Sequence, residues 1–277
     1  MSIVAISETA GSLGNEIGRR LAERLGYRFA DREIIAKASE RFGENVTDLR
    51  HAAEEKPTLW ERLTDTQRRY KLFVEAIILE MAGGDNVVLA GLSSAIVLRP
   101  VPHALRVRAD APERIRADRV QQQQGLTREA ALDHVRQTDH ERAARVKFLY
   151  HVSVDDPFLY DVAVNTERLT ADEGARLLQE AVQQPRFRTS ADSQRQIIDL
   201  GIVAGAKAAF RASPMMDPGE VFVSANGGYV SLSGAVDGEE GRQLAQEMVE
   251  KIPGVTGVLN EIRAGGPSAG KPESGKR

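Results

Sequence analysis

The sequence predicts an α/β protein built on a parallel sheet, followed by a second and smaller α+β domain. Residues 3–7 form a short, uninterrupted apolar strand that leads directly into a glycine-containing loop and then a helix. Further apolar strands, at 86–91, 104–109 and 160–165, are separated by helical segments, and this alternation implies a parallel sheet. A chain of 277 residues also exceeds the usual size of one such domain.

The composition narrows the classes of function. The formal net charge of -3 predicts no general affinity for nucleic acid. The chain has no cysteine, which excludes disulfides, thiolate metal sites and cysteine nucleophiles, and its five histidines lack the spacing of a metal site. The N-terminal residues show neither a basic leader nor a long apolar run, so we predict no signal peptide, no membrane span and a cytoplasmic location.

The helices of the first domain are predicted from their spacing and caps. Ile17, Leu21 and Leu25 recur at helical spacing, and Gly26 is placed to cap that helix. An edge strand at 27–30 follows, and Asp31 can N-cap the next helix. The later predicted helices are 60–81, ended by Gly83-Gly84, one that begins at Pro112, 128–136 capped by Thr127, a separate one containing 139–145, and one capped by Thr170 that ends near residue 182; residues 45–56 are polar.

The remainder of the chain has a different pattern. Residues 183–195 are interpreted as a linker, and 196–263 as the second domain. Its predicted elements are a helix at 197–210, strands at 221–224 and 229–233 joined through Asn226-Gly227-Gly228 as a hairpin, a helix at 239–251 and a strand at 255–262. Residues 264–277 are rich in Gly, Pro, Ser and Lys and are predicted to be a disordered tail.

The loop after the first strand has the features of a phosphate-binding loop. Unpaired backbone N–H groups at a helix N-terminus bind anions, and glycine lets the chain turn close to a phosphate. Gly11, Ser12 and Gly14 meet this requirement, but Asn15 and Glu16 stand where the usual motif has Lys and a hydroxyl residue. By spacing alone, the loop is either a phosphate site or an ordinary strand-turn-helix connection.

One segment of the chain is rich in arginine and is a candidate local anion-binding surface. Its members are Arg106, Arg108, Arg114, Arg116, Arg119, Arg128, Arg136, Arg142 and Arg145. Arg114, Arg116 and Arg119 also lie next to Glu113 and Asp118, so a solvated helix face remains an alternative interpretation.

The order of these motifs resembles the cytidylate kinase-like family over residues 1–182. The matching segments are 6–7, 11–22, 25–26, 31–35, 88–91, 106–119, 125–130, 139–142 and 160–169. The resemblance implies a P-loop three-layer fold and transfer of a phosphoryl group from ATP to a nucleoside monophosphate, of cytidylate type. Members of this family have a glycine loop poor in lysine, so the missing lysine does not exclude membership.

The resemblance also implies roles for particular residues. The donor nucleotide would be bound by Gly11, Ser12, Leu13, Gly14, Asn15 and Glu16. The positive charge that a phosphoryl transition state needs would come from a mobile lid carrying Arg114, Arg116, Arg119, Arg142 and Arg145. Asp139 would orient one of these arginines through a bidentate pair, and Asp31 and Arg32 would lie on the acceptor side. Mg²⁺ would be held by phosphates and water, with no metal ligand from the protein. For Asp31, a helix N-cap is the alternative.

Three positions depart from the family pattern. Leu13 replaces a glycine, Asn15 replaces an arginine of the loop, and Leu92 follows Gly91 where an arginine is common. Two positive charges are therefore missing from the expected site, and loss of such charge lowers the rate of transfer. The alternative to a kinase is a nucleotide-binding sensor without catalytic activity.

The second domain resembles a BON domain, a small αββαβ module, through residues 221–224, 226–236 and 252–260. BON domains bind ligands, lipids or proteins and have no catalytic residues, so the resemblance implies a binding or regulatory element. The second domain would then regulate the kinase, deliver the output of a sensor, or, as a third alternative, make the chain an envelope-associated binding protein.

Overall fold

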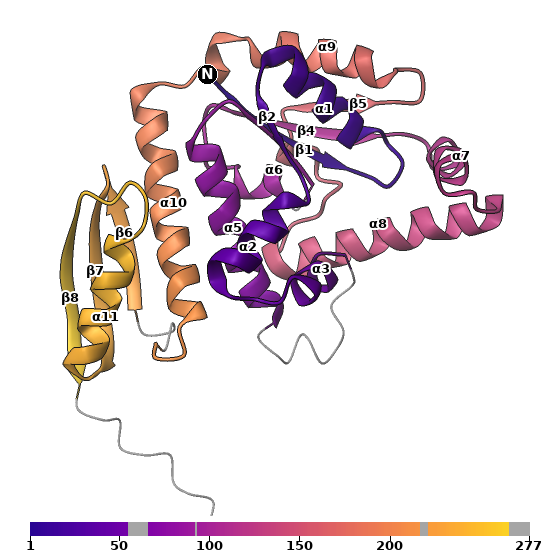
Figure 1. Cartoon of the computed structure of the whole chain (residues 1–277). Coiled ribbons are helices and arrows are strands. Elements are labelled where there is room, and N and C mark those ends of the chain that lie inside the picture. Colours follow the sequence, from indigo (N-terminus) through magenta and orange to yellow (C-terminus); the bar gives the residue numbers. More distant parts are fainter. Residues whose placement is uncertain (55–65, 92, 217–220, 266–277) are drawn as a thin grey trace, which may run out of the picture.

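The computed structural model describes residues 1–54, 66–91, 93–216 and 221–265, which form two sheets with their helices (Figure 1). A five-stranded parallel sheet has the strand order β2-β3-β1-β4-β5, and a three-stranded sheet has the order β6-β7-β8. The predicted fold class, a parallel α/β domain followed by a small α+β domain, is confirmed.

The elements of the first domain alternate between strand and helix along the chain. They are β1 Ile3–Glu8, α1 Gly14–Leu25, β2 Arg28–Ala30, α2 Glu33–Phe42, α3 Val46–Glu54, α5 Thr66–Gly83, β3 Val87–Ala90, α6 Ser94–Val97, β4 Ala104–Asp110, α7 Glu113–Gln124, α8 Arg128–Tyr150, β5 Val162–Asn165 and α9 Ala171–Val182. Two 3₁₀ turns, η1 Pro157–Leu159 and η2 Pro185–Phe187, follow α8 and α9.

The central strand β1 determines where both layers of helices pack. It pairs with β3 on one side and β4 on the other, and Ile3, Val4, Ala5 and Ile6 have no exposed surface. Side chains of a strand alternate between the two faces of its sheet. Ile3 and Ala5 accordingly pack in a core with α5, while Val4 and Ile6 pack with α1 and α9, and the result is three layers.

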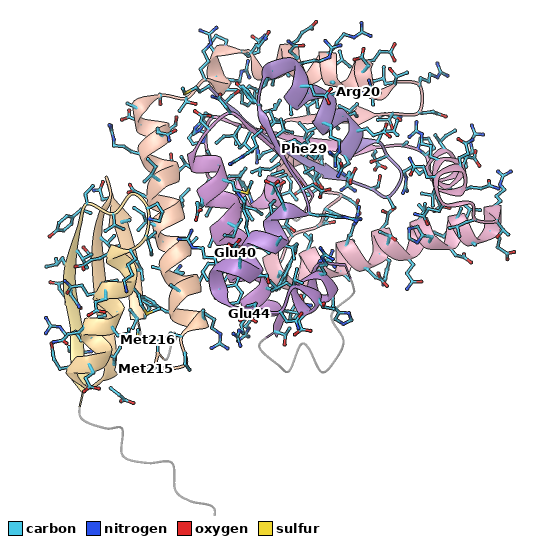
Figure 2. All side chains as sticks on the ribbon, in the orientation of Figure 1. Arg20, Phe29, Glu40, Glu44, Met215 and Met216 are labelled. Atoms are coloured by element: carbon cyan, nitrogen blue, oxygen red, sulfur yellow. The ribbon has the colours of Figure 1, made fainter. Side chains whose placement is uncertain are left out.

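Most helix ends lie where the sequence places them. Gly26 ends α1 with φ 67°, Thr127 caps α8, and Thr170 and Glu173 form a capping box on α9. At the sheet edge, Phe29 of β2 lies beside α1 (Figure 2), and its ring is so close to Gly18 that a Cβ there would be 2.9 Å from it. A glycine at position 18 therefore allows α1 to lie close to the sheet.

One expectation about the helices differs from the structure, and one further helix was not predicted. The predicted break between 128–136 and 139–145 is wrong, because α8 is one helix of 23 residues with no glycine or proline in it. The polar segment 45–56 contains α3. The beginning of the predicted helix at 60–81 and the Leu92 position both lie outside the described residues.

The second domain has the predicted order of helix, two strands, helix and strand. Its elements are α10 Ala191–Ala212, β6 Val221–Asn226, β7 Tyr229–Asp237, α11 Gly238–Glu250 and β8 Gly257–Gly265. β6 and β7 form the predicted antiparallel hairpin around Gly227 and Gly228, which have φ of 60° and 82°. The segment 183–195 contains η2 and the beginning of α10, and β8 extends to residue 265, into the segment 264–277 that we expected to be a tail.

Helix α10 is shared by the cores of both domains. Ile197 and Ala208 belong to the core beneath the large sheet, whereas Ile202, Ala206 and Phe210 belong to the core of the small sheet, and all five are buried. Figure 1 shows α10 between α5 and the small sheet. At the foot of α10, Met216 joins the small core while Met215 is exposed (Figure 2). The two domains therefore have one helix in common rather than a flexible connection.

We expect the two domains to unfold in one transition because α10 contributes to both cores. Ile197→Ala and Ile202→Ala remove the same side chain from opposite faces of α10, and each is expected to cost roughly 2–5 kcal/mol. Circular dichroism and calorimetry should show a single transition that both substitutions lower. Two separate transitions, each moved by only one substitution, would contradict the shared core.

Candidate functional site

The glycine loop lies at the C-terminal end of β1, between this strand and the first turn of α1. Ligand sites of parallel α/β sheets form at the carboxyl ends of their strands. Gly11 has φ 75° and Leu13 has φ 65°, so both adopt the left-handed conformation. Leu13 stands where the resemblance described above implies a glycine, and the left-handed conformation accounts for that expectation, since a residue with a Cβ costs about 1–2 kcal/mol there.

Three consecutive carbonyl groups of the loop are held by side chains from other elements. Arg116 Nη1 donates to the Ala10 oxygen at 3.0 Å, Arg119 Nη1 to the Gly11 oxygen at 3.2 Å and Thr166 Oγ1 to the Ser12 oxygen at 2.9 Å. In a trans peptide the N–H points away from the preceding carbonyl oxygen. The N–H groups of Gly11 and Leu13 consequently point away from these three side chains, as an anion-binding loop requires.

The loop is also packed too tightly for side chains at its glycines. A Cβ on Gly11 would lie 2.6 Å from the Arg116 carbonyl oxygen. A Cβ on Gly14 would lie 2.7 Å from the Glu8 carboxylate and 2.7 Å from the Glu8 Cβ. Both glycines are thus required by close approach, and not by flexibility alone.

Asp139 of α8 connects the loop to Arg116 of α7. Its Oδ1 accepts from the Ala10 N–H at 2.9 Å, and its Oδ2 accepts from Arg116 Nη1 at 2.6 Å. Asp139 does contact a lid arginine, but the pair is not bidentate, because the second oxygen is taken by the loop. A small apolar core with Ala117, Val120, Ala131 and Val135 joins α7 to α8.

Asn15 bridges the loop and the beginning of α2. Its Nδ2 donates to Asp31 Oδ2 at 2.7 Å, and its backbone N–H donates to Glu8 Oε2 at 2.8 Å. The carboxylate of Asp31 therefore faces the loop and not its own helix, whose N-cap position is held by Arg32 without a side-chain hydrogen bond. The N-cap alternative for Asp31 is wrong.

Glu8 lies at the centre of the charged groups. Burial raises the pKa of its carboxyl, while Arg142, the hydrogen bond from Asn15 and, more weakly, Arg108 act against that rise. Asp31 raises the pKa further. Arg142 Nη1 also donates to the Glu8 carbonyl oxygen at 3.2 Å. A half-buried carboxylate thus accepts the Asn15 N–H of the first helical turn.

The other predicted site residues are more dispersed. Arg114 is largely exposed, with Glu167 at 3.8 Å, and Glu16 and Arg32 are exposed. Arg145 is buried, and its charge lowers the pKa of Tyr70, although burial dominates and raises that pKa to about 12. Arg116, by contrast, is buried and held by three acceptors, the third being the Ala111 oxygen at 2.8 Å. Arg116 and Arg119 therefore brace the loop in this conformation, and the alternative of a solvated face is wrong for Arg116.

Sequence reasoning did not assign Glu8 and Thr166 to the site. Glu8 is the last residue of β1, and Thr166 directly follows β5. Their positions at the carboxyl ends of predicted strands are the signal that could have found them. Thr166 also has no exposed surface.

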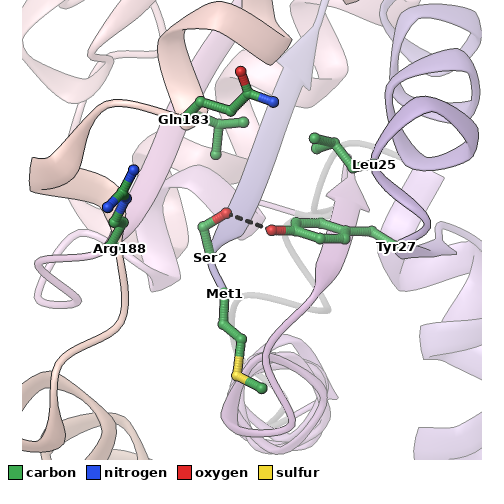
Figure 3. A pocket seen from close by; sticks show the side chains of 7 residues that line it. Met1, Ser2, Leu25, Tyr27, Gln183 and Arg188 are labelled. Carbon is green, nitrogen blue, oxygen red and sulfur yellow. Dashed lines mark hydrogen bonds between the residues drawn. The ribbon is translucent and has the colours of Figure 1, made fainter.

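A hollow lined by described residues lies away from this loop. It measures about 450 Å³ and is lined by Met1, Ser2, Leu25, Tyr27, Val182, Gln183 and Arg188 (Figure 3). Ser2 and Tyr27 share a hydrogen bond of 2.9 Å there. Since β1 begins at this hollow and ends at the glycine loop, the two lie at opposite ends of this strand.

Within the described residues, no group of three or more His, Cys, Asp or Glu side chains is arranged to hold a metal ion. None of the helices described is long and apolar enough to cross a membrane.

Comparison with known proteins shows the family to which the chain belongs. The model of the cytidylate kinase-like family matches residues 3–168, and the BON domain model matches residues 199–266. The cytidylate kinase of Pyrococcus furiosus is 27% identical over 172 residues, covering 61% of this chain and 82% of that protein. The cytidylate kinase of Natronomonas pharaonis is 28% identical over 182 residues, covering 65% and 88%.

A solved structure shares the fold of the first domain. An uncharacterized protein from Eubacterium ventriosum superposes with a TM-score of 0.53 at 16% identity, over 66% of this chain and 99% of that one. The fold and loop define a phosphate-loop α/β domain. The chain belongs to the cytidylate kinase-like family and carries a C-terminal BON domain.

We predict that Glu8→Gln stabilises the protein increasingly as pH rises. Because the folded pKa of Glu8 is raised, the folded chain holds its proton more tightly than the unfolded chain. The free energy of unfolding therefore falls from about the ordinary pKa of 4.5 upward, until the folded pKa is passed. Urea denaturation of both proteins across this range should show a difference that grows with pH and then levels.

The matched control for this pH series is Glu40→Gln. Glu40 is exposed on α2 (Figure 2), so its substitution should change stability by less than about 0.5 kcal/mol at each pH. Other carboxyls with a raised pKa, such as that of Glu75, are present in wild type and in both variants, so their contributions cancel when stabilities are compared. A Glu8→Gln difference that stays flat with pH would contradict the prediction.

Proposed function

We propose that the chain is a nucleoside monophosphate kinase of cytidylate type, which transfers a phosphoryl group from ATP to the acceptor. Membership of the family supports nucleotide kinase activity. The observation that carries the proposal is the row of three held carbonyls in the glycine loop, because it leaves the N–H groups of Gly11 and Leu13 pointing away from those side chains and available to an anion.

The loop has the features that the phosphates of ATP need. Ser12 Oγ is buried and has no hydrogen-bond partner among the described residues, so the loop retains a hydroxyl that can bond a phosphoryl oxygen. The first turn of α1 adds N–H groups and the positive end of its dipole. Gly11, Ser12, Leu13 and Gly14 would hold the phosphates, with Asn15 and Glu16 at the beginning of the helix. ATP supplies the transferable phosphoryl group, and Mg²⁺ would accompany it, bound by phosphates and water.

The arginines divide into two roles. Arg116 and Arg119 keep the loop in its binding conformation, and Asp139 fixes Arg116. Arg142 donates to the Glu8 carbonyl oxygen at the end of β1, and Arg114 is exposed at the beginning of α7. We assign Arg142 and Arg114 to charge stabilisation of the transferred group, and Asp31 and Arg32 to the acceptor side.

The BON domain is proposed to be a binding element that acts on the kinase domain through α10. Gly201 of α10 faces Leu79 of α5, and the charge of Lys207 acts on Glu75 of α5. A ligand or protein that shifts α10 would therefore shift α5, which packs against the large sheet.

A nucleotide sensor without turnover is the second candidate, and it is favoured by the charge at the loop. The Glu8 carboxylate accepts from the Asn15 N–H, which in a kinase is available to phosphate, and Asn15 itself has no charge. A negative group at this point opposes the negative charge of ATP.

We expect purified protein with ATP, Mg²⁺ and CMP to form CDP, measured by separation of the products. Gly14→Ala should abolish this turnover, because its Cβ would collide with Glu8. Gly83→Ala is the matched control, since a Cβ at this helix end meets nothing within 4 Å and should leave turnover unchanged.

The result decides between the candidates. ATP binding by calorimetry without a diphosphate from any nucleoside monophosphate would establish the sensor and overturn the kinase. Absence of both binding and turnover would overturn both. Equal activity of Gly14→Ala and wild type would show that the loop is not the site.

A further inference from the structure

Arg108 of β4 lies next to the candidate site and is not one of its predicted residues. It stands opposite Ser7 in the register of β1 and β4, on the face of the sheet that α5 covers. Its Nη1 donates to Ser7 Oγ at 3.1 Å, and only 12% of its side chain is exposed. A guanidinium at this depth is unusual unless an anion compensates it.

The hydrogen-bond and ion-pair partners of Arg108 leave its charge largely uncompensated. Arg106, two residues earlier, binds both oxygens of Asp161 at 2.8 and 3.0 Å. For Arg108, the one carboxylate of the described residues within ion-pair distance is Asp155, at 4.0 Å, and its side chain is 83% exposed. Such a pair contributes little to stability. Arg106 has the geometry of a structural pair, and Arg108 does not.

The surroundings of Arg108 are preorganised. The Tyr160 ring centre lies 5.8 Å from the Arg108 guanidinium carbon, and the Tyr160 hydroxyl donates to the Val154 oxygen at 2.9 Å, which fixes the ring. Arg108 and Arg142 both act electrostatically on Glu8, the residue whose carboxylate accepts from Asn15. Arg108 and Arg142 thus both lie near Glu8, beside the part of the loop where Asn15 provides no charge.

We infer that Arg108 binds the phosphate of the acceptor nucleoside monophosphate and, from β4, supplies positive charge that Asn15 lacks. The inference rests on the proposed function. The acceptor is favoured over ATP because the loop N–H groups begin α1, which covers the other face of the sheet, whereas Arg108 points to the face of α5. A phosphate placed between Arg108 and Arg142 would have a charge-assisted partner on each side.

The test uses Arg108→Met, which keeps an apolar stem but removes the charge, and Arg108→Lys, which keeps a charge. Arg106→Met is the matched control on the same strand. Initial rates are measured with CMP and ATP varied separately, and binding of CMP and of cytidine is measured by calorimetry. Melting temperatures of all variants establish that they are folded.

We expect Arg108→Met to raise KM for CMP by about tenfold or more while KM for ATP changes by less than about twofold. Cytidine lacks the phosphate, so its affinity should not change, and Arg108→Lys should recover part of the CMP affinity. Arg106→Met should lower the melting temperature and leave KM for CMP unaltered. A purely structural role of Arg108 would not separate CMP from cytidine.

Other outcomes overturn the inference separately from the proposed function. If wild type makes CDP but Arg108→Met keeps its KM for CMP, or changes only the KM for ATP, the inference fails and the kinase stands. If wild type binds CMP without turnover, and Arg108→Met weakens CMP but not cytidine, the kinase fails and the phosphate contact stands. If wild type neither turns over nor binds CMP, both fail.

Discussion

The loop after β1 depends on hydrogen bonds that reach its carbonyl groups from more than 100 residues away in the sequence. Arg116, Arg119 and Thr166 hold the Ala10, Gly11 and Ser12 oxygens, and without them the loop could present its carbonyls to a ligand as readily as its N–H groups. The parallel register of β1, β4 and β5 brings these side chains together, because Thr166 follows β5 and the two arginines follow β4 on α7. The sheet is therefore the part of the fold that positions the side chains holding these three carbonyls.

Charge balance around Glu8 decides what the site can do. A carboxylate that accepts an N–H of the first helical turn fills part of the space of an anion, and burial raises its pKa. Arg142 and Arg108 partly offset its charge, while Asp31 adds to it. Binding of a nucleotide requires that the cations prevail over these carboxylates. With Asn15 in place of an arginine, the positive and negative charges at the site are more nearly equal than in a loop that carries its own positive charge. A kinase and a sensor would differ in this charge balance and not in fold.

Local pattern was sufficient for the fold but not for the complete site. The strands, Gly26, Thr127 and Thr170 were predicted correctly because apolar runs and caps act within a few residues. Glu8 was missed because its surroundings come from Asn15 of α1 and Arg142 of α8, which are distant from it in sequence or lie in another element. Arg108 was named among the arginines of the candidate surface but was not singled out, because its weak pairing is visible only beside the bidentate pair of Arg106. The break predicted in α8 was wrong because no glycine or proline interrupts the helix there. The burial of α10 in two cores is likewise a result of tertiary packing, since an amphipathic pattern in the sequence does not show that a helix packs against two different sheets.

The orientation of the loop N–H groups is the central claim, and amide NMR tests it most directly. Labelled protein is titrated with ATP, and the amide resonances of Gly11, Leu13 and Gly14 are followed with those of Gly227 and Gly228 in the hairpin of the BON domain as reference. The account predicts large, saturable shifts in the loop amides and almost none in the hairpin. Saturable binding of ATP that leaves the loop amides unshifted would contradict it, because the phosphates would then lie elsewhere.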